Sequence, residues 1–131
     1  MSQLVDAWFA AMRRGRKGEE ELLALFHEHA HYVEPFSGEP REHVGKPAIR
    51  ACFREGWETP MPDLELLVER VDVDGDRIRA TWVCSTSAWP SPIRGLDVYT
   101  LRDGLIMRLE TSVEAPPNAT AGSPPESPPS R

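Results

Sequence analysis

Residues 22–41 read LLALFHEHAHYVEPFSGEPR, and the change of pattern inside this stretch decides how the chain folds. Leucines at helical spacing follow the acidic run EEE, whose charges suit the first turn of a helix. From His31 the residues alternate, which is typical of a strand, and Pro35 ends that strand. We therefore expect a helix over residues 19–29, a strand from His31, and a loop over residues 37–45.

The chain on either side of this stretch divides into helices before and strands after. LVDAWFAAM at 4–12 places its apolar side chains on one helical face. KPAIRACFREGWE at 46–58 does the same, with a proline near its start. The alternating segments that follow are separated by tight-turn signals, DGD at 74–76 and RDG at 102–104. The expected strands are residues 64–73, 77–87, 93–101 and 105–114.

Three helices followed by antiparallel strands indicate an α+β fold in which the helices cover one face of a curved sheet. We expect this domain to occupy residues 1–114. Residues 115–131 contain six of the 13 prolines and no aromatic or large aliphatic residue. Such a segment buries too little apolar area to offset its ordering entropy, so we expect a disordered tail rich in proline and serine.

Composition narrows the class of protein. The net charge is −6, whereas nucleic-acid binding by counterion release needs a basic surface. No apolar run approaches the roughly 20 residues of a membrane span. Cys52 and Cys84 are isolated in the sequence, which favours reduced thiols over a disulfide. We therefore expect a cytoplasmic protein that has neither a nucleic acid nor a membrane as its partner.

The alternation of His27, His29 and His31 raises the question of a metal site. Metal ligands must place their donor atoms around one point about 2 Å away. In the expected structure these histidines lie on both sides of a helix–strand junction, and no third ligand stands at a useful spacing. A histidine near a helix C-terminus also has a simpler use, because it interacts favourably with the dipole when charged. We therefore predict a solvated junction, with no metal and no other cofactor.

The order of elements, together with three short motifs, resembles the nuclear transport factor 2-like superfamily in its SnoaL-like and ketosteroid-isomerase-like branch. The motifs are the stretch at 22–41, GKPAIRACF at 45–53 and IRGLDVYTLRDGLI at 93–106. The resemblance implies a cone-shaped roll, of the cystatin-like kind, in which three N-terminal helices pack on a strongly curved, mainly antiparallel sheet. It also implies an apolar pocket at one end and a homodimer formed through the outer face of the sheet.

Two acids are the candidate catalytic residues. Asp97 alternates with apolar residues in IRGLDVYTL, so it points to the core side, where a carboxyl group tends to stay protonated. Glu34 precedes Pro35 at the end of the first strand. In ketosteroid isomerases an acid at the position of Glu34 is the general base. A protonated acid at the position of Asp97 donates to the developing oxyanion. The resemblance therefore implies these roles for Glu34 and Asp97.

The chain also departs from that family. The tyrosine that donates to the oxyanion from the first helix is replaced by Trp8, and the supporting tyrosine of the third helix is replaced by Phe53. Losing one such donor typically raises the barrier by about 3 kcal/mol. A steroid isomerase is therefore disfavoured, although proton transfer on another molecule remains open. A limonene-epoxide-hydrolase-like site is also disfavoured, because Thr111 stands where a second aspartate is needed.

These features leave two classes of function open. The first is a SnoaL-like small-molecule pocket protein that catalyses proton transfer, as an isomerase or cyclase does, on an apolar carbonyl-type substrate. The second is a non-catalytic module of the same fold, which either binds an apolar ligand or acts only as a structural dimer. We expect Arg41 to be solvated. The candidate ligand-binding residues are Trp8, Tyr32, Phe53, Trp57, Trp82, Tyr99 and Val113.

Overall fold

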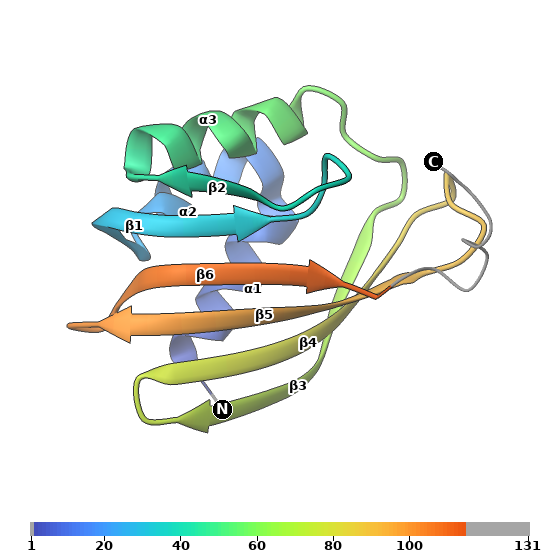
Figure 1. Ribbon diagram of the computed structural model, residues 1–131. Coiled ribbons are helices and arrows are strands. Elements are labelled where there is room, and N and C mark those ends of the chain that lie inside the picture. The colour runs from blue at the N-terminus through green and yellow to red at the C-terminus, as the bar shows by residue number, and fades with distance from the viewer. Residues whose placement is uncertain (1, 115–131) are drawn as a thin grey trace.

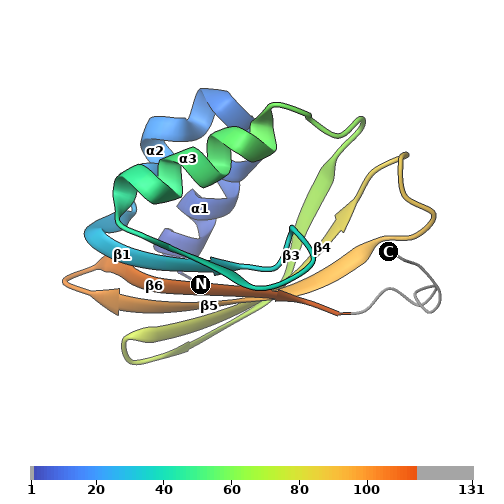
Figure 2. The same ribbon diagram turned by 45° about the horizontal axis from the view of Figure 1, so that its top comes forward.

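A six-stranded sheet carries all the helices on one of its faces in the computed structural model, which describes residues 2–114 (Figure 1). Its strand order is β2-β1-β6-β5-β4-β3, and every neighbouring pair is antiparallel except β1 and β6, which run parallel. Figure 2 shows the sheet curling towards the helices at one end and leaving its other face uncovered by helices. This arrangement confirms the predicted α+β fold. The predicted tail at 115–131 lies outside the described residues.

Helix α1, Gln3–Arg14, packs its apolar stripe onto the sheet. Its N-terminus is capped by Ser2, whose side chain accepts a hydrogen bond from the amide of Val5 at 3.3 Å. Val5, Trp8, Phe9 and Ala11 are buried, as the spacing of residues 4–12 predicts. A short 3₁₀ turn, Gly15–Gly18, then reverses the chain and leads into α2, Glu19–Leu23.

The boundary between α2 and β1 lies earlier than the sequence predicts. Helix α2 ends at Leu23, and β1 covers Phe26–Glu34, so the expectation of a helix to His29 is wrong. Long-range pairing explains the difference, because Phe26 stands opposite Ile106 of β6, and the Ile106 amide donates to the carbonyl of Leu25 at 2.8 Å. Sheet contacts of this kind override a local preference for helix.

Strand β2, Arg41–Val44, was expected to be loop, and that expectation is also wrong. It is a four-residue edge strand paired antiparallel with β1, and its residues are polar except for one valine. A short polar edge strand has no alternation of apolar residues to reveal it. The pairing brings Arg41 opposite Glu34 and His43 opposite Tyr32.

The remaining elements agree with the predicted segments to within about two residues. Helix α3 covers Lys46–Trp57 and has its proline in the first turn. Two tight turns close the hairpins at the predicted places, with Gly75 and Gly104 in left-handed conformations. No helix among the described residues is long and apolar enough to cross a membrane. The last four strands are β3 Glu65–Asp74, β4 Arg77–Ser85, β5 Ile93–Arg102 and β6 Leu105–Val113.

Helix α3 is fixed over β1 by an ion-pair cluster centred on Glu19 of α2. Arg54 donates from Nε and Nη2 to this carboxylate at 2.7 and 2.8 Å, and Arg50 adds a further bond. The hydrogen bonds from Arg54, with those from Arg50, lower the pKa of Glu19 to about 2. The cluster sets the position from which α3 presents Cys52 and Phe53 towards β1.

Candidate functional site

A cavity of about 450 Å³ lies between the helices and the curled end of the sheet. Side chains from α1, β1 and β4 form its inner wall, among them Trp8, Tyr32 and Trp82. Phe36, Leu64 and Trp89 come from three loops that gather at the same end of the molecule in Figures 1 and 2. The lining is mostly apolar, as in sites for small organic molecules.

Asp97 of β5 brings a carboxyl group to the wall of this cavity. Its side chain is almost fully buried, as the alternation of IRGLDVYTL predicts. Thr111 donates from Oγ1 to Oδ1 at 2.7 Å, and Tyr99 donates from its hydroxyl to Oδ2 at 2.9 Å. Burial raises the pKa of Asp97 and outweighs these hydrogen bonds, which favour the charged form. The site therefore presents a carboxylic acid whose ionised state is also supported by two hydroxyl groups.

Trp82 of β4 is the second polar group of the wall. Its indole Nε1 is buried and has no hydrogen-bond partner among the described residues. The same N–H is directed at Asp97 and favours that group's charged form as a hydrogen-bond donor does, although its geometry falls short of a full hydrogen bond. A buried donor without a partner is uncommon and unfavourable, so it indicates a place where another acceptor fits. Trp82 and Asp97 thus place two potential donors near each other at the wall of the cavity.

The position of the Trp82 ring depends on the glycine that faces it across the sheet. Gly95 of β5 is the cross-strand partner of Trp82. A Cβ atom at Gly95 would lie 2.1 Å from Cζ2 of the indole, which is far inside van der Waals contact. The ring therefore lies directly on the Gly95 backbone, and the absence of a side chain there sets how far the indole projects into the cavity.

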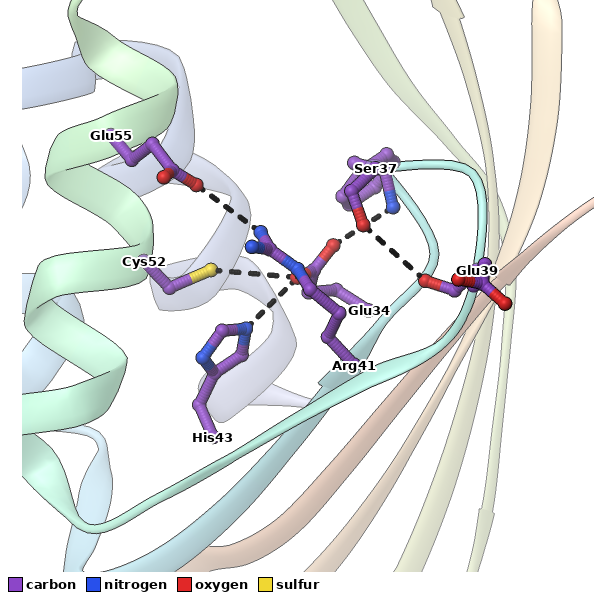
Figure 3. A network of polar contacts seen from close by, with 8 residues as sticks. Glu34, Ser37, Glu39, Arg41, His43, Cys52 and Glu55 are labelled. Carbon is purple, nitrogen blue, oxygen red and sulfur yellow. Dashed lines mark hydrogen bonds and ion pairs between the residues drawn. The ribbon is translucent and has the colours of Figure 1, made fainter. Parts of the chain in front are cut away.

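Glu34 lies in a different environment from Asp97, at the end of β1 (Figure 3). Only 1% of the residue is exposed. Its Oε1 accepts from the amide of Phe36 at 2.8 Å, and its Oε2 accepts from Nε of Arg41 and lies 2.9 Å from Nε2 of His43. An ionised carboxylate only accepts hydrogen bonds, so Nε2 of His43 carries the hydrogen here.

The pKa of Glu34 is shifted in the opposite direction from the pKa of Asp97. Burial alone would raise the pKa of Glu34, but the hydrogen bonds from His43, Phe36 and Arg41 outweigh it and lower the pKa below its usual value. The thiol of Cys52 points at the same carboxylate from α3, with Sγ 3.9 Å from Oε2 (Figure 3). Burial, assisted by the nearby charge of Glu34, raises the pKa of Cys52 to about 12.

The structure brings some of the predicted site residues together and separates others. Trp8, Tyr32, Trp82, Val113 and Asp97 line the cavity, whereas Glu34 is not among the described residues that line it. Phe53, Trp57 and Tyr99 also lie outside the lining. Phe53 stacks between Tyr32 and Trp57, with ring centroids 5.2 and 5.8 Å apart. Tyr99 instead lies behind Asp97 and orients it.

The residues that surround Glu34 were not predicted from the sequence. Arg41, expected to be solvated, bonds to Glu34 and to Oε1 of Glu55, the latter at 3.2 Å. His43 was assigned to a loop and given no role. Both residues are on β2, so recognising that strand would have placed them beside Glu34. The only available signal was the i, i+2 spacing of Arg41 and His43, which puts them on one face of a strand.

The three histidines of β1 do not form a cluster. His29 is exposed, and its ring centroid lies 5.8 Å from that of His27. His31 places Nδ1 2.6 Å from a carboxylate oxygen of Glu42 on β2. The predicted helical positions of His27 and His29 are wrong, because both belong to β1, whereas His31 lies in this strand as predicted. Among the described residues, the group of potential metal ligands consists of Glu34, His43 and Cys52 instead.

Comparison with known proteins agrees with this fold. Residues 5–109 match the family described as the SnoaL-like domain, and the chain therefore belongs to that family. No curated protein matches the chain. The predicted likeness to SnoaL-like and ketosteroid-isomerase-like proteins is confirmed.

Three solved structures illustrate the shared fold. A protein of Sinorhizobium meliloti, provisionally described as a polyketide cyclase, is 22% identical with a TM-score of 0.71 and covers 86% of this chain and 95% of its own. A Kribbella flavida protein, provisionally described as a ketosteroid isomerase, is 20% identical with a TM-score of 0.65. The match covers 95% of this chain and 89% of that protein. A Catenulispora acidiphila protein of ketosteroid-isomerase-like fold, in complex with trimethylamine, is 16% identical with a TM-score of 0.67. The match covers 86% of this chain and 85% of that protein.

Proposed function

We propose that this protein binds an apolar small molecule bearing a carbonyl-type oxygen and catalyses acid/base proton transfer on it, as an isomerase or cyclase does. The observation that carries the proposal is Asp97, a buried carboxylic acid at the wall of an apolar cavity. Burial raises the pKa of Asp97, which makes this acid better suited than an exposed one to donating and recovering a proton.

The proposed chemistry uses the two donors of the cavity wall together. A substrate oxygen accepts from the Asp97 hydroxyl and from Nε1 of Trp82. Asp97 transfers its proton to that oxygen, which activates the carbonyl group, and Thr111 and Tyr99 stabilise the carboxylate that is left. The same carboxylate then removes a proton from carbon elsewhere in the substrate, which restores the acid. Trp82 thus supplies a second donor in a chain where Trp8 replaces the family's tyrosine.

Glu34, which the resemblance implies as the base, stays an alternative in this scheme. Its oxygens already accept from Phe36, Arg41 and His43, and the ionised state that they favour makes it a weak base. We therefore assign both proton-transfer steps to Asp97. A base role for Glu34 would require at least one of these hydrogen bonds to open when the substrate binds.

The second candidate function is a binding module, which the partly altered donor set and the preformed cavity support. A screen with apolar ketones, quinones and epoxides separates the two functions. A ligand at 100 times its Kd is expected to stabilise the fold by about 2.7 kcal/mol, and the indoles of the cavity should report its binding by fluorescence. Recovery of altered ligand supports the enzyme, and recovery of unaltered ligand supports the binding module. If no apolar compound shifts the melting temperature, neither proposal holds, and a structural role remains.

We also propose that two copies associate through the outer face of the sheet. No described helix covers this face in Figures 1 and 2, and a hollow of about 370 Å³ lies on it beside Thr81, Leu96 and Ser112. Sedimentation should give twice the chain mass of 14.7 kDa, and Leu96→Glu should give the monomer mass. A monomer at micromolar concentration in the wild type would contradict this assembly.

The proposed location is the cytoplasm, which suits two free thiols.

A further inference from the structure

We propose that Glu34, His43 and Cys52 form a binding site for a thiophilic divalent cation of the Zn²⁺ type, separate from the cavity. One oxygen, one nitrogen and one sulfur converge there from three different elements, β1, β2 and α3 (Figure 3). The inference is independent of the proposed function, because none of the three residues lines the cavity.

The distances within the cluster are close to those of a tetrahedral site. The potential ligand atoms all lie within 4.8 Å of one another. Oε2 of Glu34 is 2.9 Å from Nε2 of His43 and 3.9 Å from Sγ of Cys52. Ligands around tetrahedral zinc are separated by about 3.4 Å for oxygen and nitrogen and about 3.6 Å for oxygen and sulfur. Small side-chain movements are therefore enough to bring the oxygen to the required distance from each of the other two ligands.

The backbone places the three side chains without special conformations. Glu34 and Tyr32 are inward-facing residues of β1, and the antiparallel pairing with β2 sets His43 opposite Tyr32 on the same face. Cys52 faces them from α3, one residue before Phe53, which stacks on Tyr32. The stacking of Phe53 on Tyr32 therefore holds α3 where Cys52 faces Glu34 and His43.

The donor set also selects the class of cation. Thiolate and imidazole favour zinc and similar borderline-soft ions over calcium or magnesium, which prefer oxygen ligands alone. When the cation binds, the thiol proton leaves Cys52, and the hydrogen of His43 moves from Nε2 to Nδ1. Three protein ligands leave a fourth position for water or another small ligand.

Arg41 competes with the cation for the same oxygen. Its guanidinium donates to Oε2 of Glu34 at 2.9 Å, and its charge opposes a second positive charge there. The side chain is 41% exposed and also bonds to Glu55 of α3, so it has a partner when it leaves Glu34. This competition predicts an unusual result, namely that removing Arg41 tightens cation binding.

Titration of the purified protein with Co²⁺ and Zn²⁺ tests this site, because Co²⁺ bound to a thiolate gives a near-ultraviolet charge-transfer band. We expect one Co²⁺ per chain with that band, and displacement by Zn²⁺. Cys52→Ser and His43→Gln should each weaken cation binding by at least about 10- to 100-fold. That is the usual loss when a residue that only hydrogen-bonds to a metal ligand is replaced, and these two residues are proposed as ligands themselves. Arg41→Gln should strengthen it. Cys84→Ser is the matched control, because that free thiol lies on β4, outside the cluster.

Three results would overturn the site: no charge-transfer band, a band that Cys52→Ser retains, or a band that Cys84→Ser also loses. Circular dichroism and melting curves of each variant separate lost ligation from lost folding, and Cys52→Ala serves as a second variant if Cys52→Ser fails to fold. Failure here leaves the proposed function untouched, since the ligand screen uses the cavity and no metal.

Discussion

Replacing Asp97 by asparagine is expected to lower kcat by about 10²- to 10⁴-fold, the usual contribution of a general acid or base. Asparagine has nearly the same shape, and either neighbouring hydroxyl can turn to accept from the new amide, so the fold should be retained. Steady-state kinetics on the substrate found in the ligand screen provide the measurement.

Stability supplies an independent signature of the same substitution. Burial raises the pKa of Asp97, so this acid contributes stability that is fully present below its unfolded pKa and is lost as the pH rises through its folded pKa. Asparagine does not ionise. The variant should therefore gain stability relative to the wild type as the pH rises, which urea unfolding at pH 5 and pH 9 would show.

Asp103→Asn is the matched control for Asp97→Asn. Asp103 is exposed in the turn between β5 and β6 and has a positive φ of 55°, a conformation that asparagine also tolerates. The Asp103→Asn variant should have the same activity and the same pH profile as the wild type. Full activity in Asp97→Asn would contradict the proposed mechanism. If instead Glu34→Gln lowers kcat as much as Asp97→Asn, the proton transfer requires Glu34 as well, and the assignment to Asp97 alone is wrong.

Gly95→Ala is expected to damage both stability and ligand binding, although alanine suits a strand better than glycine. The new Cβ would lie 2.1 Å from the Trp82 ring, so the indole must move towards the cavity. Overpacking of this kind typically destabilises a protein by about 1–3 kcal/mol. Each 1.4 kcal/mol of binding free energy that is lost when the ring is displaced raises the Kd of a ligand about tenfold. Melting curves and ligand titration measure the two effects separately.

A second glycine provides the comparison for Gly95→Ala. Gly56 lies on the exposed side of α3, and a Cβ there would meet nothing within 4 Å. Gly56→Ala should therefore stabilise the protein by about 0.5–1 kcal/mol through helix propensity and leave ligand binding unchanged. Adding Trp82→Phe to Gly95→Ala should restore part of the lost stability. If Gly95→Ala binds ligand normally, the indole does not set the shape of the cavity.

The sequence predicted those features that depend on local pattern. Alternation along β5 was enough to turn Asp97 inward, because every second residue of a strand shares a face. The hairpin turns were visible from their Asp-Gly pairs. The end of α2 was not, because residues 24–29 suit a helix and a strand equally well until β6 pairs with them. β2 was missed because its polar residues carry no apolar alternation.

The candidate site was harder to predict than the fold. Phe36, Leu64 and Trp89 come from three loops, and their meeting depends on how the sheet curls. Glu34 and Asp97 looked alike as acids next to apolar residues, yet hydrogen bonds outweigh burial at Glu34, whereas burial outweighs the hydrogen bonds at Asp97. That difference arises from tertiary neighbours, which spacing along one strand does not reveal.

The parallel pairing of β1 with β6 has a consequence for how the chain is made. β6 lies between β1 and β5, so among the strands of residues 2–114 the one made last joins β2 and β1 to β5, β4 and β3. Without β6, the pairing of the other strands leaves two separate sheets, β2-β1 and β5-β4-β3, each with an open edge. A chain that stops at Gly104 should therefore show no cooperative unfolding transition, and biosynthesis must reach nearly the end of the domain before native topology exists.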